Sequence, residues 1–252
     1  WRWNVTVMAS TLSNKVKKLT GGNDDIINGV YIIREGEELN TFYMAKSAGV
    51  DPTTGEQLYW AYEKNADGSM KPGTEYITND ATVAASSKYL QGSRIPDVYG
   101  SISTTLSFRN FDLGVLMTYS VGGKIYDAIY QAMMEPSFVG QTYHRNALRS
   151  WRTSGDITDV PRATTTLSSQ ISDRFLVNAS YFAIKNITLG YNLPARVLAK
   201  AGIGALRVYL SADSPWIFTH LKGMNPQANF TGSTSYSYTP NRTVTLGVDL
   251  KF

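Results

Sequence analysis

The sequence of 252 residues contains no cysteine and only two histidines, His144 and His220. The absence of cysteine excludes a disulfide framework and any metal site built on thiolates. No apolar run approaches the roughly 18 residues of a membrane-crossing helix. The HExxH, GxSxG and Walker-type patterns of hydrolases and nucleotide-binding enzymes are also missing. We therefore expect no metal, no cofactor and no catalytic residues.

Charged residues are sparse as well, at 17% of the chain, with a formal net charge of +4. No basic stripe is interleaved with aromatic residues, so nucleic-acid binding is not expected. A mild basic excess suits anionic lipid headgroups instead. The chain begins at Trp1-Arg2-Trp3 with no methionine and no apolar leader, which indicates a piece of a longer polypeptide.

Aromatic residues and glycine are abundant, with 16 Tyr, 9 Phe, 5 Trp and 21 Gly, which favours strands and turns. Residues 242–252 alternate strictly between apolar and polar side chains, so a strand here has one face of each kind. A tilted strand crosses the hydrocarbon core of a membrane in about 9 to 11 residues. An amphipathic strand of a soluble sandwich would alternate in the same way, so the remaining residues must distinguish a membrane-spanning strand from a soluble one.

Other stretches repeat this pattern over unusual lengths. Residues 98–108 and 111–121 alternate on both sides of Arg109-Asn110, which predicts a tight hairpin. Residues 175–193 alternate with a change of phase that a β-bulge near Lys185-Asn186 would explain. Such strands exceed the usual length of about five or six residues. Further strands are predicted at residues 1–10, 26–33, 41–48 and 205–218.

The connections between these strands fall into two classes. Residues 34–40, 109–110 and 194–204 make short connections, whereas the others are long and rich in polar residues and glycine. Short turns on one side and long loops on the other are typical of outer-membrane barrels. We therefore predict an all-β, transmembrane antiparallel β-barrel segment of about eight strands. Interfacial aromatic girdles and a C-terminal signal are predicted at Trp1, Trp3, Tyr119, Tyr191 and Phe252.

Several motifs resemble the SusC/RagA family of TonB-dependent outer-membrane transporters. The sequence RIPDVYGSISTTLSFRNFDL at residues 94–113 is followed by YSVGGKIYD at 119–127 and ASYFAIKNITLGYNLP at 179–194. Residues 206–214, 222–226 and 243–252 continue the likeness, and AGVDPTTG at 48–55 precedes it. Together these motifs cover most of the chain in the family's order.

The resemblance implies that residues 1–252 supply about the last eight strands of a plugged barrel of about 22 strands. The plug domain and the earlier strands are absent from this chain. Family members reside in the bacterial outer membrane and import oligosaccharides or peptides. A SusD-like surface lipoprotein acts as their lid, and TonB acts on the N-terminal region.

Within this interpretation, the connection after residue 121 carries the candidates for contact with ligand or lid. Aromatic rings stack on sugars, and arginine pairs with carboxylates. The alternative is that these rings only pack the loop against its neighbours. The candidates are Tyr126, Tyr130, Tyr143, His144, Arg145, Trp151 and Arg152.

Two other classes of protein remain open at this stage. One is a self-contained small outer-membrane barrel acting as an enzyme or adhesin, for which Asp213 and His220 come nearest to a catalytic pair. No nucleophile accompanies them. The other is a soluble sandwich lectin, which would not explain such long strands with long loops on one side.

Overall fold

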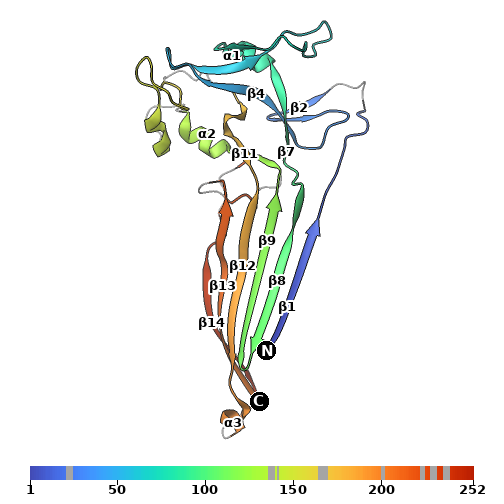
Figure 1. Cartoon of the computed structure of the whole chain (residues 1–252), viewed down its shortest axis with the longest axis vertical. Coiled ribbons are helices and arrows are strands. Elements are labelled where there is room, and N and C mark those ends of the chain that lie inside the picture. The colour runs from blue at the N-terminus through green and yellow to red at the C-terminus, as the bar shows by residue number, and fades with distance from the viewer. Residues whose placement is uncertain are drawn as a thin grey trace.

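The computed structural model describes residues 1–20, 25–135, 140, 142–163, 170–199, 202–221, 225–227, 232–234 and 239–252. These residues form two parts that lie end to end, a tall sheet of long strands and a wider head (Figure 1). Both chain termini lie at the end of the tall sheet that is remote from the head.

The long sheet has six antiparallel strands in the order β1-β8-β9-β12-β13-β14. The predicted all-β class is therefore confirmed, and the bulge in β12 is observed as a register shift between Ile184 and Asn186. The strands are β1 (Arg2–Ser10), β8 (Val98–Phe108), β9 (Phe111–Val121), β12 (Tyr181–Asn192), β13 (Ala205–Thr219) and β14 (Thr243–Lys251).

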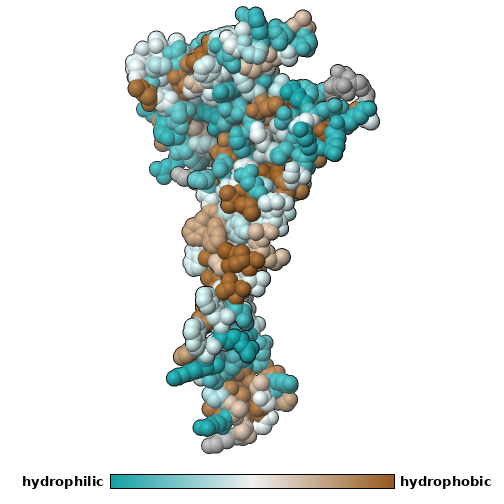
Figure 2. Space-filling model, turned by 45° about the vertical axis from the view of Figure 1, so that its right-hand side comes forward, coloured by the Kyte–Doolittle hydropathy of each residue, from teal (hydrophilic) through white to brown (hydrophobic). Residues whose placement is uncertain are grey.

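The strand register divides the long sheet into an apolar and a polar face. One row of paired residues crosses all six strands on the apolar face: Trp3, Leu106, Leu113, Leu189, Leu210 and Leu246. The adjacent row on the other face is Asn4, Thr105, Gly114, Thr188, Ser211 and Thr245. The apolar row is open to its surroundings, with Leu246 at 73% exposure. Figure 2 shows hydrophobic residues along the middle of the long sheet and mainly hydrophilic ones over the head. A sheet that exposes its apolar face requires an apolar environment.

The head is built from the long connections between the strands of the long sheet. A second sheet runs in the order β2-β3-β4-β5-β6, and β7 pairs with β4. Its strands are β2 (Ile26–Asn28), β3 (Tyr31–Ile33), β4 (Thr41–Val50), β5 (Gln57–Ala61), β6 (Tyr76–Thr78) and β7 (Lys88–Ser93). The other elements of the head are α1 (Ala81–Ser86), β10 (Lys124–Tyr126), α2 (Ala128–Met134), η1 (Arg145–Arg149), η2 (Asp173–Phe175) and β11 (Leu176–Asn178).

The main core of the head joins two connections that are far apart in the sequence. Phe42 and Met44 of β4 pack against Tyr126, Val160 and Phe175 of the connection between β9 and β12. Burial of several large apolar side chains stabilises the head by about 1.5–3 kcal/mol for each of them. The head is therefore a folded unit that presents a defined surface.

The structure differs from the sequence prediction in where two strands lie. The stretches predicted at 26–33 and 41–48 belong to the head sheet, so six of the eight expected strands form the long sheet. The short connection at 34–40 lies in the head too, whereas residues 109–110 and α3 (Ala195–Leu198) lie at the opposite end, near the termini. The polar stretch 49–94 contains β5, β6, α1 and β7. Residues 222–224 of the family resemblance lie outside the described residues.

Candidate functional site

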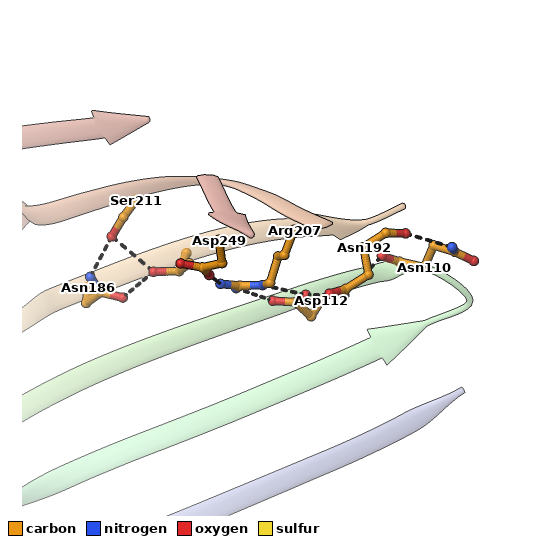
Figure 3. Close-up of polar contacts among 8 residues, drawn as sticks. Asn110, Asp112, Asn186, Asn192, Arg207, Ser211 and Asp249 are labelled. Carbon is orange, nitrogen blue, oxygen red and sulfur yellow. Dashed lines mark hydrogen bonds and ion pairs between the residues drawn. The ribbon is translucent and has the colours of Figure 1, made fainter. Parts of the chain in front are cut away.

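A charged network links four strands on the polar face of the long sheet, at the end near the termini (Figure 3). Arg207 of β13 donates through Nη2 to Asp112 Oδ2 at 2.6 Å and through Nε to Oδ1 at 3.2 Å. Its Nη1 lies 3.3 Å from Asp249 Oδ2 on β14. Asn192 of β12 donates to Asp112 Oδ1 at 2.9 Å, and Asn110 donates to the carbonyl of Asn192 at 2.7 Å. The two-pronged Arg207–Asp112 pair fixes the register of β9, β12 and β13 at this end.

A second polar cluster surrounds the bulge of β12. Asn186 donates to Ser211 Oγ at 3.0 Å and to Asp213 Oδ1 at 2.7 Å. The neighbouring Lys185 Nζ donates to Gln227 Oε1 at 2.5 Å. The bulge thus turns a lysine towards the connection between β13 and β14. This contact could be found only from the structure, because no sequence pattern links residues 185 and 227.

A hollow with a mixed polar and apolar lining lies where the head joins the long sheet. It is lined by residues from both parts, among them Glu38, Asp97 and Lys124. Ser93 donates a short hydrogen bond to the Glu38 carboxylate. Carboxylates and an ammonium group in one hollow can bind the termini of a peptide or the hydroxyl groups of a sugar. The sequence predicted none of these residues as site residues.

Two charged residues are half-buried where the second long connection crosses the head sheet. The backbone N–H of Ser47 donates to Asp173 Oδ1 at 2.7 Å, while burial raises the pKa of Asp173 above its ordinary value of 3.8. Burial lowers the pKa of Arg174, whose guanidinium lies 5.0 Å from the centre of the Phe175 ring. A raised folded-state pKa means that the fold favours the protonated Asp173. The protonated Asp173 therefore contributes fully to stability below the pKa that this carboxyl has in the unfolded chain. The contribution is lost as the pH rises through its higher pKa in the folded chain.

The candidates Tyr126 and Tyr130 lie inside the head. Tyr126 is 2% exposed, its hydroxyl donates to Gln131 Oε1 at 2.6 Å, and burial raises its pKa. Tyr130 packs edge-on against the rings of His144 and Phe175. The rings of both tyrosines thus contribute to the packing between the loop and its neighbours.

The candidates Tyr143, His144 and Arg145 mark the start of η1. Tyr143 is 42% exposed, and the Arg145 side chain is exposed too. His144 caps the helix, since its Nδ1 accepts from the backbone N–H of Asn146 at 3.1 Å. Tyr143 and Arg145 are therefore the accessible members of this group, whereas His144 orients the short helix.

Trp151 and Arg152 lie just after η1 and differ in role. Trp151 Nε1 donates to the carbonyl of Pro52 at 2.9 Å, and its ring covers Gly55. Gly55 has a φ of +73° and leaves no room for a Cβ beside the indole. The indole therefore locks this loop onto the turn between β4 and β5. Arg152 stays exposed, with Nη2 3.3 Å from the carbonyl of Leu148.

The five predicted girdle residues lie towards the two ends of the long sheet. Trp1, Trp3, Tyr191 and Phe252 lie towards the end with the termini, and Tyr191 packs 4.7 Å from the Phe111 ring centre. Tyr119 lies towards the head and donates to the carbonyl of Met8 at 3.1 Å. Phe111 and Tyr119 are eight residues apart on β9, or about 27 Å along the strand. This spacing suits two interfaces of one membrane, and the girdle assignment stays a prediction.

Within the described part of the chain, no three or more His, Cys, Asp or Glu side chains form a group that could hold a metal ion. No helix in the same part is both long and apolar enough to span a bilayer.

Comparison with known proteins places these features in a family context. The chain is 27% identical over 273 residues to TonB-dependent receptor P3 of Formosa agariphila, covering 99% of this chain and 27% of that receptor. It is 25% identical over 262 residues to TonB-dependent receptor SusC of Bacteroides thetaiotaomicron, covering 24% of that protein. The chain therefore spans about a quarter of the length of these relatives. A search of protein-family profiles gives no match.

Solved structures agree with the sequence relatives. The RagAB peptide importer in its closed-closed state superimposes with a TM-score of 0.83 and 28% identity, covering 99% of this chain and 27% of that one. Its open-open state gives a TM-score of 0.77. The relatives are receptors and transporters, which points against enzymatic activity.

The long sheet, with its open apolar face and polar reverse, matches a segment of the barrels of these outer-membrane transporters. TonB-dependent receptors are outer-membrane proteins of Gram-negative bacteria, and the predicted location is confirmed. The chain is SusC/RagA-like over nearly its whole length, as its motifs indicate.

Proposed function

We propose that this chain forms part of a TonB-dependent transporter that imports oligosaccharides or peptides across the outer membrane. The observation that carries the proposal is the combination of a two-faced long sheet with a head folded from its long connections. The apolar face contacts lipid, and the polar face lines the interior of the barrel. The head then lies outside the cell, because outer-membrane barrels place long loops there and short turns in the periplasm.

The described part of the chain supplies six strands to the long sheet, fewer than the eight of the smallest bacterial barrels. We therefore propose that further strands from a longer polypeptide complete a plugged barrel of about 22 strands, with this chain as its C-terminal part. This favours the transporter over a self-contained small barrel. The plug and the segment that contacts TonB would belong to the remainder of the polypeptide.

The partner in this proposal is a SusD-like surface lipoprotein that covers the head. The solved structures that superimpose on this chain are those of the RagAB peptide importer in its closed-closed and open-open states. We propose Tyr143, Arg145 and Arg152 as the accessible contacts for ligand or lid. The hollow where the head joins the long sheet, lined by Glu38 and Lys124 among others, is a second ligand contact on the path to the interior.

The test is uptake by cells that carry the full-length receptor. Fluorescent oligosaccharides and peptides are offered to wild-type cells, to cells lacking the receptor and to cells lacking TonB. We expect one class of compound to accumulate only when receptor and TonB are both present. Equal accumulation in all three strains for both classes would refute the proposal.

A further inference from the structure

A second hollow opens near the head ends of β12 and β13 (Figure 1). β13 pairs with β12 as far as Thr219, whereas its pairing with β14 ends at Asp213. Residues 214–219 therefore lack β14 as a neighbour, and the hollow lies beside them with a volume of about 360 Å³. Ligand pockets span about 300–1,000 Å³, so this hollow is large enough to hold part of a ligand.

Two cations line this hollow, which we name the basic hollow: Lys185 from the bulge of β12 and Arg242 from the segment before β14. Its other polar lining residues are Ser214, Thr219, Asn225, Gln227 and Thr239. No aspartate or glutamate is among the described residues that line it. The charge that the hollow presents is therefore positive only.

The basic hollow opens on the polar face of the long sheet. Lys185 Nζ donates to Gln227 Oε1 at 2.5 Å, and Gln227 Nε2 lies 3.4 Å from Thr118 Oγ1. Thr118 alternates with the apolar residues of β9, so it lies on the polar face. Ala183 pairs with Thr118 and Ile217 pairs with Ala183, so these two lining residues share that face. In the proposed function, this face lines the interior of the barrel.

The two cations are not neutralised by the described part of the chain. The acceptor for Lys185 is the neutral amide of Gln227. Arg242 is exposed and makes no hydrogen bond or ion pair with the described residues. Asp213 directly precedes the lining stretch of β13, but its carboxylate accepts from Asn186 Nδ2 at 2.7 Å. Two cations without a carboxylate in one hollow favour an anionic ligand.

The segment that carries Asn225 and Gln227 is fixed before a ligand arrives. Arg94 Nη2 donates to the carbonyl of Pro226 at 2.9 Å, and Pro226 is fully buried. Asn225 Oδ1 accepts from the backbone N–H of Gln227 at 2.9 Å, so its NH2 group is the part that can donate to a ligand. A site that is ordered in advance loses less conformational entropy when it binds.

We infer that the basic hollow binds a carboxylate of the imported compound, so that the receptor selects acidic compounds over their uncharged counterparts. Guanidinium and ammonium groups donate charge-assisted hydrogen bonds to carboxylates, whereas a neutral compound would leave both cations unpaired. Carboxylate is an anionic group that peptides share with oligosaccharides of uronic acids, so the chemistry of the site is the same for either source. This inference rests on the proposed function and adds the chemistry of the compound that is imported.

The test is retention of matched compounds by purified full-length receptor in detergent, quantified by mass spectrometry. The probes are pentapeptides without acidic residues, with a free or an amidated C-terminus, and trigalacturonate with its methyl ester. For at least one pair, we expect the wild type to retain the carboxylate form at least about tenfold more than the uncharged form. Added salt should reduce this preference.

Variants assign the preference to the hollow. Lys185→Gln/Arg242→Gln should bring the two forms close to equal retention, while Arg242→Lys, which keeps the charge, should keep most of the preference. The matched control is Arg196→Gln/Lys251→Gln, which removes the same charge from two exposed residues at the opposite end of the long sheet. This control should retain the preference of the wild type.

The outcomes separate this inference from the proposed function. A preference within the peptide pair alone, or within the galacturonate pair alone, supports the inference and identifies the source of the carboxylate. Equal retention of both forms by the wild type, retention of neither, or an unchanged preference in the double variant overturns the inference. Uptake that still depends on receptor and TonB would then leave the proposed function standing. Uptake that depends on neither refutes the proposed function itself.

Discussion

Arginine substitutions along β14 measure directly which face of the long sheet meets lipid. Leu246 is the fourth of nine residues in this strand, about 10 Å along it from Thr243 and about 17 Å from Lys251. It is therefore close to the middle of the apolar face, where its side chain is 73% exposed. An arginine at the bilayer midplane of a barrel costs about 2–4 kcal/mol, falling to about 0–1 kcal/mol near an interface.

We expect Leu246→Arg to lower the free energy of unfolding by about 2–4 kcal/mol, which is roughly a 30- to 700-fold change in the folding equilibrium. Leu250→Arg, near the strand end, should cost about 0–1 kcal/mol. Thr245→Arg points to the polar face opposite Ser211 and should cost less than Leu246→Arg. The assay is urea unfolding of the full-length receptor in phosphatidylcholine vesicles. Equal costs at positions 245 and 246 would refute the assignment of the two faces.

Three further predictions concern the polar network and the head. Asp112→Ala removes the carboxylate that accepts two hydrogen bonds from Arg207 and should lower the free energy of unfolding by about 1–2 kcal/mol in the same urea assay. An unchanged free energy of unfolding would show that this pair does not contribute to stability. Gly55→Ala should displace the Trp151 ring and speed tryptic cleavage of the full-length receptor between residues 149 and 162, and unchanged cleavage would contradict this packing. In the wild type we expect the hydrogen-exchange protection of β4 to be higher near pH 4 than near pH 7. Asp173→Asn should flatten this pH dependence. A variant as pH-dependent as the wild type would assign the effect to another group.

The long sheet could be predicted from the sequence because its signal is local. Alternation over eleven residues on both sides of Arg109-Asn110 defines strands, turn and faces together, and the structure has this hairpin as β8 and β9. Even the bulge near Lys185 followed from a change of phase, since two apolar half-strands must reach the same face.

The head could not be predicted, because its contacts are not local. The apolar run 26–33 resembles one strand, but Gly29 at φ +60° folds it into the β2–β3 hairpin. The packing partners of Phe42 include Phe175, from the second long connection. No periodicity in either stretch indicates that pairing. The same long-range dependence explains the misplacement of two strands in the long sheet.

The candidate site was predictable by residue type and not by arrangement. Alternation places Asp112 and Arg207 on the polar face, but their pairing depends on a register set by strand order and by the bulge. Among the loop candidates, Tyr126 is chemically as suitable for ligand contact as Tyr143. Only the fold shows that one is buried and the other accessible.

The bulge of β12 makes one position of the long sheet tolerant to a change in chain length. Lys185 stands between Ile184, paired with Met117, and Asn186, paired with Leu116. Its deletion would leave every pairing of β12 with β9 in place and restore plain alternation against that strand, whereas residues 214 and 215 of β13 would still lie unpaired between Asp213 and Trp216. A deletion elsewhere in a long strand would move the side chains of half of that strand to the opposite face of the sheet. A sequence that lacks this residue can therefore keep the same side chains of β9 and β12 on the membrane-facing surface.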